Sequence, residues 1–191
     1  MRPSLRSFLV AALLLPTLAY SQVTPEVHGN FSADGQYYND DPDIGAVPPP
    51  QQFGANAWGN VIFSMGNFQA GMRLESYEPA LLGYPAGQPY KGSGIGYRYI
   101  SYKLADLEVT AGNFYEQFGQ GLIFRSYEER YLGVDNAMDG VRVRYKPVQG
   151  VYVKGVIGRQ RLGFDDGTTK GEGLVRGVDG EVSISELDSA W

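Results

Sequence analysis

Cysteine is absent from this chain of 191 residues, and histidine occurs only once, at His28. Without cysteine there is no disulfide framework and no lipid attachment site behind an export signal. A histidine-dependent catalytic triad or zinc site would have to include His28. Because a lone histidine near a strand end usually forms an interfacial hydrogen bond, the sequence predicts no catalytic residue, no metal site and no cofactor. An enzyme is an alternative that loss of an activity in His28→Ala would support.

Positive charge is also scarce, since 16 basic residues stand against 21 acidic ones. Two of the bases lie in the first 21 residues, which leaves 14 bases and 21 acids, a charge of −7, in the rest. An acidic chain offers no electrostatic footprint for nucleic acid. Beyond the first 21 residues there is no run of 18 apolar residues, so any membrane crossing must use strands of a closed barrel.

The N-terminal residues have the pattern of a secretory signal peptide. Arg2 and Arg6 precede an apolar run at 8–15, and the small residues Ala19 and Ser21 lie just ahead of a cleavage site. The sequence therefore predicts a signal peptide at 1–21 followed by a β-barrel domain at 22–191. The chain is then either an exported soluble β-protein or an outer-membrane barrel.

Apolar and polar residues alternate with period two in several segments, most clearly at 27–38. Successive side chains of a strand point to opposite faces, so this segment has one apolar and one polar side. A length of ten to twelve residues suits a tilted strand that crosses a bilayer, which needs roughly 9–11 residues. Length therefore favours a membrane strand over a strand of a soluble sandwich.

Long and short connections alternate along the chain. Eight strands are predicted, at 27–38, 55–65, 68–77, 94–103, 107–114, 140–146, 151–158 and 173–185. The long connections are 39–54, 78–93, 115–139 and 159–172. Outer-membrane barrels have long extracellular loops and short periplasmic turns. We therefore predict an all-β fold, an antiparallel up-and-down transmembrane β-barrel; Greek-key crossovers in a soluble β-domain are the alternative.

If the apolar side of each strand faces lipid, a set of charged residues points into the lumen, because a charge on the lipid side would cost roughly 2–4 kcal/mol at mid-bilayer. These candidates are Arg73, Glu75, Arg98, Glu108, Arg142, Arg144, Lys154, Asp179 and Glu181. Arg142, Arg144 and Lys154 would form a basic wall that favours anions. Alternatively, the charges form a salt-bridged network that fills a small barrel.

The stretch at 115–139 loses the period-two alternation and mixes apolar with charged residues. It is the best candidate for a loop folded inward, in which Arg125, Glu128, Glu129 and Arg130 would pair with the lumen charges. A surface loop packed against its neighbours is the equal alternative.

The last residues bear on the number of strands. The stretch at 185–189 is polar and turn-like, and Trp191 ends the chain. We expect a further strand after this turn, so that the chain is the N-terminal part of a larger barrel. A small, filled barrel of eight strands is the alternative.

Three stretches carry a resemblance to a known family: 112–119 (GNFYEQFG), 125–130 (RSYEER) and 135–141 (DNAMDGV). They resemble segments of an uncharacterised family of Bacteroidota outer-membrane β-barrel proteins of porin-like type. The resemblance covers the chain from about residue 27 onward, and it implies no activity or catalytic residue.

Two functions follow as hypotheses. The first is an outer-membrane barrel that passes or binds small hydrophilic solutes, anions included, through a polar lumen. The second is a non-transporting surface protein that binds, adheres or assembles through its long loops. The expected partners are outer-membrane lipid and small solutes, with no nucleic acid, and no pattern points to a protein partner.

Overall fold

The computed structural model describes residues 23–82 and 90–188. The predicted signal peptide at 1–21 and the terminal Trp191 lie outside the described residues. No helix within the described ranges has the length and apolar character that crossing a membrane requires.

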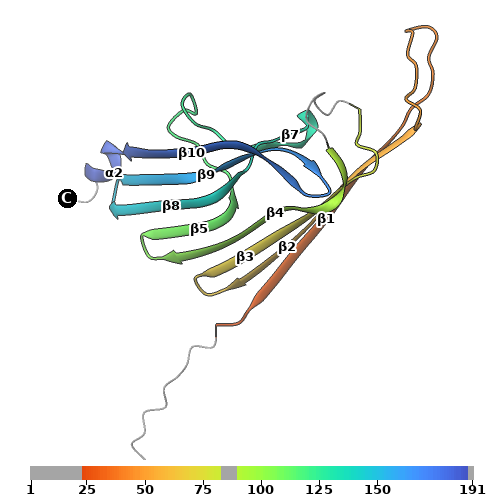
Figure 1. The fold of residues 1–191 in the computed structure, drawn as a ribbon. Coiled ribbons are helices and arrows are strands. Elements are labelled where there is room, and N and C mark those ends of the chain that lie inside the picture. The colour runs from red at the N-terminus through yellow and green to blue at the C-terminus, as the bar shows by residue number, and fades with distance from the viewer. Residues whose placement is uncertain (1–22, 83–89, 189–191) are drawn as a thin grey trace, which may run out of the picture.

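Strands dominate the structure, and eight of them form one antiparallel sheet (Figure 1). The strands are β1 (Glu26–Tyr37), β2 (Phe53–Met65), β3 (Phe68–Tyr77), β4 (Tyr90–Leu104), β5 (Leu107–Phe114), β6 (Glu128–Glu129), β7 (Val134–Asp135), β8 (Met138–Val148), β9 (Val151–Asp165) and β10 (Thr168–Val182). The order in the sheet is β1-β2-β3-β4-β5-β8-β9-β10, while β6 and β7 pair separately. The predicted all-β, up-and-down arrangement of eight strands is confirmed.

Two short helical elements complete the described chain, η2 (Arg130–Leu132) and α2 (Ile184–Asp188). The predicted hairpin between β2 and β3 turns at Gly66, whose φ of +57° lies in the left-handed region that glycine adopts without strain. The stretch predicted as a turn after the last strand is largely the short helix α2. The connection between β1 and β2 projects well beyond the sheet, as the orange segment of Figure 1 shows.

The prediction of a fourth long connection at 159–172 is wrong. β9 continues to Asp165, β10 starts at Thr168, and a tight turn with Asp166 at φ +50° joins them. The register between these strands shifts on both sides of Lys170. Such irregularities break the period-two pattern, and for this reason the sequence of a long hairpin looked like that of a loop.

The sheet has two chemically different faces, because residues paired directly across neighbouring strands point to the same side. We call one the apolar face. Arg98, Arg159 and Arg176 are exposed on it, but most of its exposed side chains are apolar, and these include Val27, Phe31, Val61, Met72, Leu74, Ile95, Ile100, Tyr102, Val109, Val141, Tyr145, Val153, Ile157, Leu174, Val178 and Val182. The opposite side, which carries Trp58, Arg73, Glu75, Glu108, Arg142, Arg144 and Lys154, we call the polar face.

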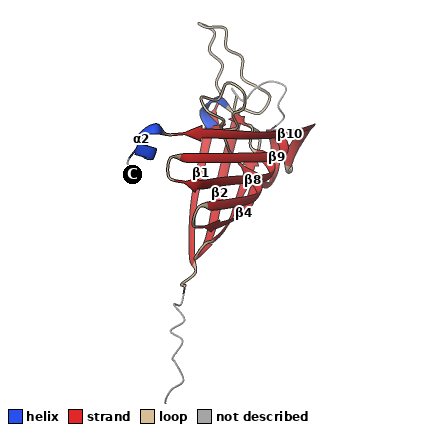
Figure 2. Cartoon of the chain, turned by 90° about the vertical axis from the view of Figure 1, so that its left-hand side faces the viewer, coloured by secondary structure: helices blue, strands red, loops and turns tan. Residues whose placement is uncertain are grey.

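Residues 115–137, between β5 and β8, leave the sheet and lie against its polar face; we call them the central segment. Arg130 reaches Ser32 on β1, and Gly119 donates a hydrogen bond to Asp179 on β10. Since one short segment contacts both edge strands, the polar face must curve around it. Figure 2 shows the first strands crossing behind the last ones.

β5 and β8 pair along the whole of β5 and end where the central segment leaves the sheet, so their neighbours β4 and β9 face each other beyond that point. Beyond the ends of these two strands, β4 and β9 pair directly in parallel, with Tyr90 opposite Phe164. The curved sheet is therefore continuous beyond the residues at which the central segment leaves it.

The hydrophobic core lies on the polar side of the sheet, under the central segment. One cluster contains Trp58, Tyr77, Tyr90 and Phe164, and another contains Phe114, Phe118, Met138 and Val156. Phe118 lies so close to Gly177 of β10 that a Cβ there would be 2.6 Å from its ring. The glycine is what allows this aromatic ring to pack directly on the strand.

Candidate functional site: the polar face and the central segment

A buried group of charges joins the central segment to the sheet. We call Arg73, Glu75, Glu128, Asp135 and Arg161 the ion cluster. Arg161 donates to both carboxylate oxygens of Glu75, at 2.9 and 2.6 Å, and to Asp135 at 2.8 Å. Arg73 donates to Glu75 at 2.7 Å and to Asp135 at 2.5 Å, and its Nη1 lies 3.0 Å from Glu128. Glu75 and Arg161 expose none of their side-chain surface.

Four strands contribute to this cluster, two of the sheet and two of the central segment. Arg73 and Glu75 are two residues apart on β3, so they share the polar face. Arg161 comes from β9, whereas Asp135 and Glu128 belong to β7 and β6 in the central segment. Buried charges of this kind are tolerated only when they are paired and hydrogen-bonded, and here each acid faces an arginine.

Aromatic hydroxyl groups surround the ion cluster. The hydroxyl of Tyr77 donates to Glu75 at 2.9 Å, and the indole of Trp58 donates to Tyr77 at 3.2 Å. Tyr115 in the central segment donates to Asp135 at 2.9 Å and stacks on Tyr97. Burial, reinforced by the Asp135 carboxylate, raises the pKa of the Tyr115 phenol. The phenol therefore remains a hydrogen-bond donor at neutral pH.

A second group of charges lies closer to the short turns, where the predicted basic wall holds the beginning of the central segment. Arg144 Nε donates to Glu116 at 2.7 Å, and Lys154 donates to the carbonyl of Gln117 at 3.2 Å. Arg142 donates to Glu108 at 2.5 Å and to the carbonyl of residue 115 at 3.1 Å. The central segment is thus attached to the polar face at both of its ends.

Eight of the nine residues predicted to point inward lie on the polar face: Arg73, Glu75, Glu108, Arg142, Arg144, Lys154, Asp179 and Glu181. Arg98 does not, and the prediction for this residue is wrong. Arg98 is paired with Met72 on the apolar face. A register shift at Gly96 brings Tyr97 opposite Arg73 and reverses the facing of every later residue of β4.

The residues predicted in the inward loop differ in their contacts. Glu128 binds Arg73, and Arg130 lies 2.7 Å from Glu128 and over the ring of Trp58. Arg125 is exposed and stacks over Tyr127, without an ion pair among the described residues. Glu129, also in this group, pairs through its backbone with Val134 in the short β6–β7 ladder.

Sequence reasoning did not select Glu116, Asp135 or Arg161. Glu116 and Asp135 lie in the stretches 112–119 and 135–141 that carry the family resemblance, and this was the available signal. Arg161 lies in the stretch 159–172, which was predicted as a loop, so its facing was not considered. Among the described residues, no group of three histidine or acidic side chains is placed to hold a metal ion.

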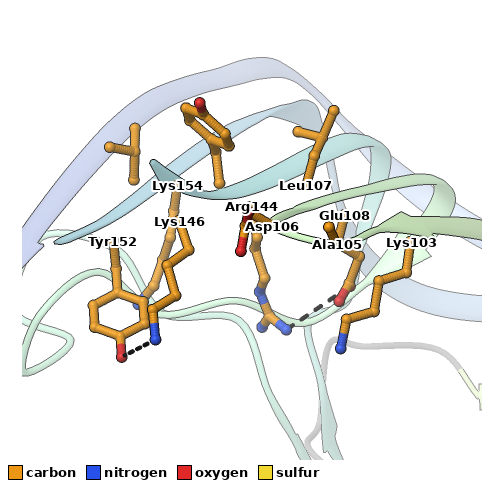
Figure 3. Close-up of a pocket in the computed structure, with 11 residues that line it drawn as sticks. Lys103, Ala105, Asp106, Leu107, Glu108, Arg144, Lys146, Tyr152 and Lys154 are labelled. Atoms are coloured by element: carbon orange, nitrogen blue, oxygen red, sulfur yellow. Dashed lines mark hydrogen bonds and ion pairs between the residues drawn. The ribbon is translucent and has the colours of Figure 1, made fainter. Parts of the chain in front are cut away.

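An open pocket of about 240 Å³ lies on the polar side between the short turns β4–β5 and β8–β9 (Figure 3). Lys103, Arg144 and Lys146 reach to the same side of the sheet, whereas Leu107 points the other way. A second pocket of about 240 Å³ shares Lys103 and Glu108 with it. A third, of about 210 Å³, shares Glu108 with both. Together the pockets form a series along the polar face.

This geometry defines the class of protein as an all-β, up-and-down sheet that curves around a segment of its own chain. The chain matches a family of unknown function (DUF6029) over residues 2–190, and it belongs to that family. No curated protein and no solved structure gave a significant match.

Proposed function

We propose that this protein is an outer-membrane β-barrel that passes or binds small hydrophilic solutes through a polar interior. The opposite chemistry of the two faces carries this proposal. Each of the eight strands of the sheet exposes at least one large apolar side chain on the apolar face. Soluble monomers rarely expose contiguous apolar patches above a few hundred Å². A continuous apolar band around a polar interior is the pattern of a bacterial barrel.

Aromatic side chains near the short turns support a membrane location with the apolar face toward lipid. Phe63 and Phe68 contact each other beside the β2–β3 turn, and Tyr102 is paired with Phe68 on the apolar face. Tyr145 lies on the same face near the β8–β9 turn. Membrane barrels have girdles of aromatic residues at the lipid–water interfaces. The short turns would then lie on the periplasmic side and the long connections outside the cell.

The central segment gives the proposed interior a constriction. It is attached near the turns through Glu116 and farther along through Asp135 and Glu128. The central segment would narrow the passage through the barrel, and the charged side chains of the polar face would still line that passage. The predicted signal peptide supports export, and the resemblance of 112–119, 125–130 and 135–141 supports an origin in Bacteroidota.

The proposal is tested by reconstituting the purified full-length protein in planar lipid bilayers. Stepwise conductance is the expected result, with heat-denatured protein as the control. Before this experiment, the folded protein should migrate faster than its boiled form on a denaturing gel. Equal migration would contradict the barrel, whereas a heat-modifiable protein without conductance would contradict transport.

A surface binding role is the second candidate, and one observation favours it. The projecting connection between β1 and β2 exposes Ile44 by 77% and Val47 by 87%. Apolar residues at the tip of a loop are suited to contact another surface. A heat-modifiable protein without conductance, whose binding to cells or matrix is lost in Ile44→Ser/Val47→Ser, would support this role.

A further inference from the structure

We infer that the pocket between the β4–β5 and β8–β9 turns binds the carboxylate or phosphate group of a small anionic solute. The inference rests on the proposed function, because it names the class of solute that the polar interior takes. The pocket is smaller than the roughly 300–1,000 Å³ typical of drug-sized ligands, so we expect a small solute.

The charge of the pocket lining favours an anion. Four cations line it (Lys103, Arg144, Lys146 and Lys154), against two acids (Asp106 and Glu108), a net charge of +2. The cations come from three strands, β4, β8 and β9, so they approach a common space from different directions. Several donors that converge on one site bind an anion more tightly than a single surface lysine does.

Three acids at or near the pocket are paired with basic side chains, and two of these pairs involve cations of the lining itself. Glu108 accepts a hydrogen bond from Arg142 at 2.5 Å. Glu181 accepts from Lys154 at 2.7 Å, and Glu186 lies 3.7 Å from Lys146. The pair with Arg142 reduces the repulsion between Glu108 and an incoming anion. Lys146 and Lys154 already have acid partners, so Lys103 and Arg144 are the main donors for an anion.

Two of the cations retain donors for a ligand. The ammonium of Lys103 has no ion-pair partner among the described residues, and its side chain is exposed toward both neighbouring pockets. Arg144 uses Nε to bind Glu116, and its side chain remains 43% exposed. Its Nη1 lies 3.9 Å from Glu108, which is beyond hydrogen-bond distance, so its terminal amino groups are the part of the guanidinium that can still donate hydrogen bonds to a second oxyanion.

Glu116 shows that these cations already bind a carboxylate. This carboxylate belongs to the central segment, is 4% exposed, and lies 2.7 Å from Arg144 and 3.9 Å from Lys154. It occupies the buried side of the arginine, while the pocket lies on the open side. A solute anion would therefore be the second anion at this arginine and would bind beside Glu116.

Binding of inorganic phosphate to the folded full-length protein in detergent tests the inference directly. Equilibrium dialysis with labelled phosphate should show one saturable site that weakens as salt is added, because screening reduces the attraction. Lys103→Glu/Lys146→Glu should weaken binding at least tenfold. Lys91→Glu is the matched control, since it makes the same change at the other end of β4 and should bind like the parent.

Heat modifiability of each variant verifies folding, and Lys103→Gln/Lys146→Gln replaces the charge-reversed variant if that variant does not fold. The absence of saturable phosphate binding, or equal binding by the double variant and the parent, overturns the inference. The bilayer experiment separates this result from the proposed function. If the protein conducts but does not bind phosphate, the proposed pore is supported and the anion site is refuted. If the protein binds phosphate but does not conduct, the anion site is supported and transport is refuted.

Discussion

Arg161→Met removes one partner from the ion cluster and keeps the approximate size of the side chain. The guanidinium of Arg161 makes three hydrogen bonds to carboxylates, two to Glu75 and one to Asp135, at 2.6 to 2.9 Å. After the substitution, two buried carboxylates share Arg73 as their remaining arginine within the cluster. The expected result is a large loss of folding stability.

The structure sets the size of this loss. Hydrogen bonds to charged groups contribute roughly 1.5–3 kcal/mol each, but the three share one donor group and do not add. Removing one partner of a buried ion pair costs about 3–5 kcal/mol. Because Arg73 still binds both acids, we expect the lower end, about 3 kcal/mol. With a urea dependence of about 2 kcal/mol per molar, the unfolding midpoint should fall by roughly 1.5 M.

Urea unfolding in lipid vesicles, followed by tryptophan fluorescence, measures this change, since Trp58 lies beside Tyr77 next to the cluster. Arg125→Met is the matched control, because Arg125 is exposed and stacks only on Tyr127; its loss should stay below about 1 kcal/mol. Glu75→Gln combined with Arg161→Met should be less destabilised than Arg161→Met alone. Equal midpoints for Arg161→Met and the parent would refute the reasoning.

Three further predictions concern the two faces of the sheet. Val141→Arg on the apolar face should destabilise the protein by roughly 2–4 kcal/mol in vesicles; a change within about 0.5 kcal/mol would mean that this face meets water. Arg98→Leu should stabilise the protein in the same unfolding assay, because it removes a charge from the apolar face, and destabilisation would contradict the assigned facing. Gly177→Leu should displace Phe118 and accelerate trypsin cleavage after Arg125 in the central segment, whereas unchanged cleavage rates would show that the segment is not held there.

The strands could be predicted because their signal is local. The hairpin of β2 and β3 shows both the two-residue turn at Gly66 and regular alternation on each side, so its predicted and observed bounds nearly agree. Alternation fails where the register shifts. Arg98 lies two residues beyond the irregularity at Gly96, and its facing is reversed for this reason. A register shift is a property of two paired strands, and one strand's sequence does not reveal it.

The candidate site was predictable only in part, for a related reason. Arg73 and Glu75 were identified because they lie on the polar side of one regular strand. Their partners Asp135 and Arg161 come from positions 60 or more residues along the chain. Which charges meet depends on the curvature of the sheet and on the path of the central segment. Neither this curvature nor this path can be read from the period-two pattern of the individual strands.

The way the central segment is held bears on what the interior does. Replacing buried ion pairs by apolar residues of similar volume is often neutral or stabilising by about 1–4 kcal/mol. If the central segment only had to fill the interior, apolar contacts such as that of Phe118 with Gly177 would therefore be sufficient to hold it against the sheet. Here Glu116 is instead bound by Arg144, whose remaining donors face an open pocket. Polar attachment keeps the interior hydrated and leaves donors of Arg144 to which a solute anion can bind beside Glu116, and apolar packing would supply no such donors.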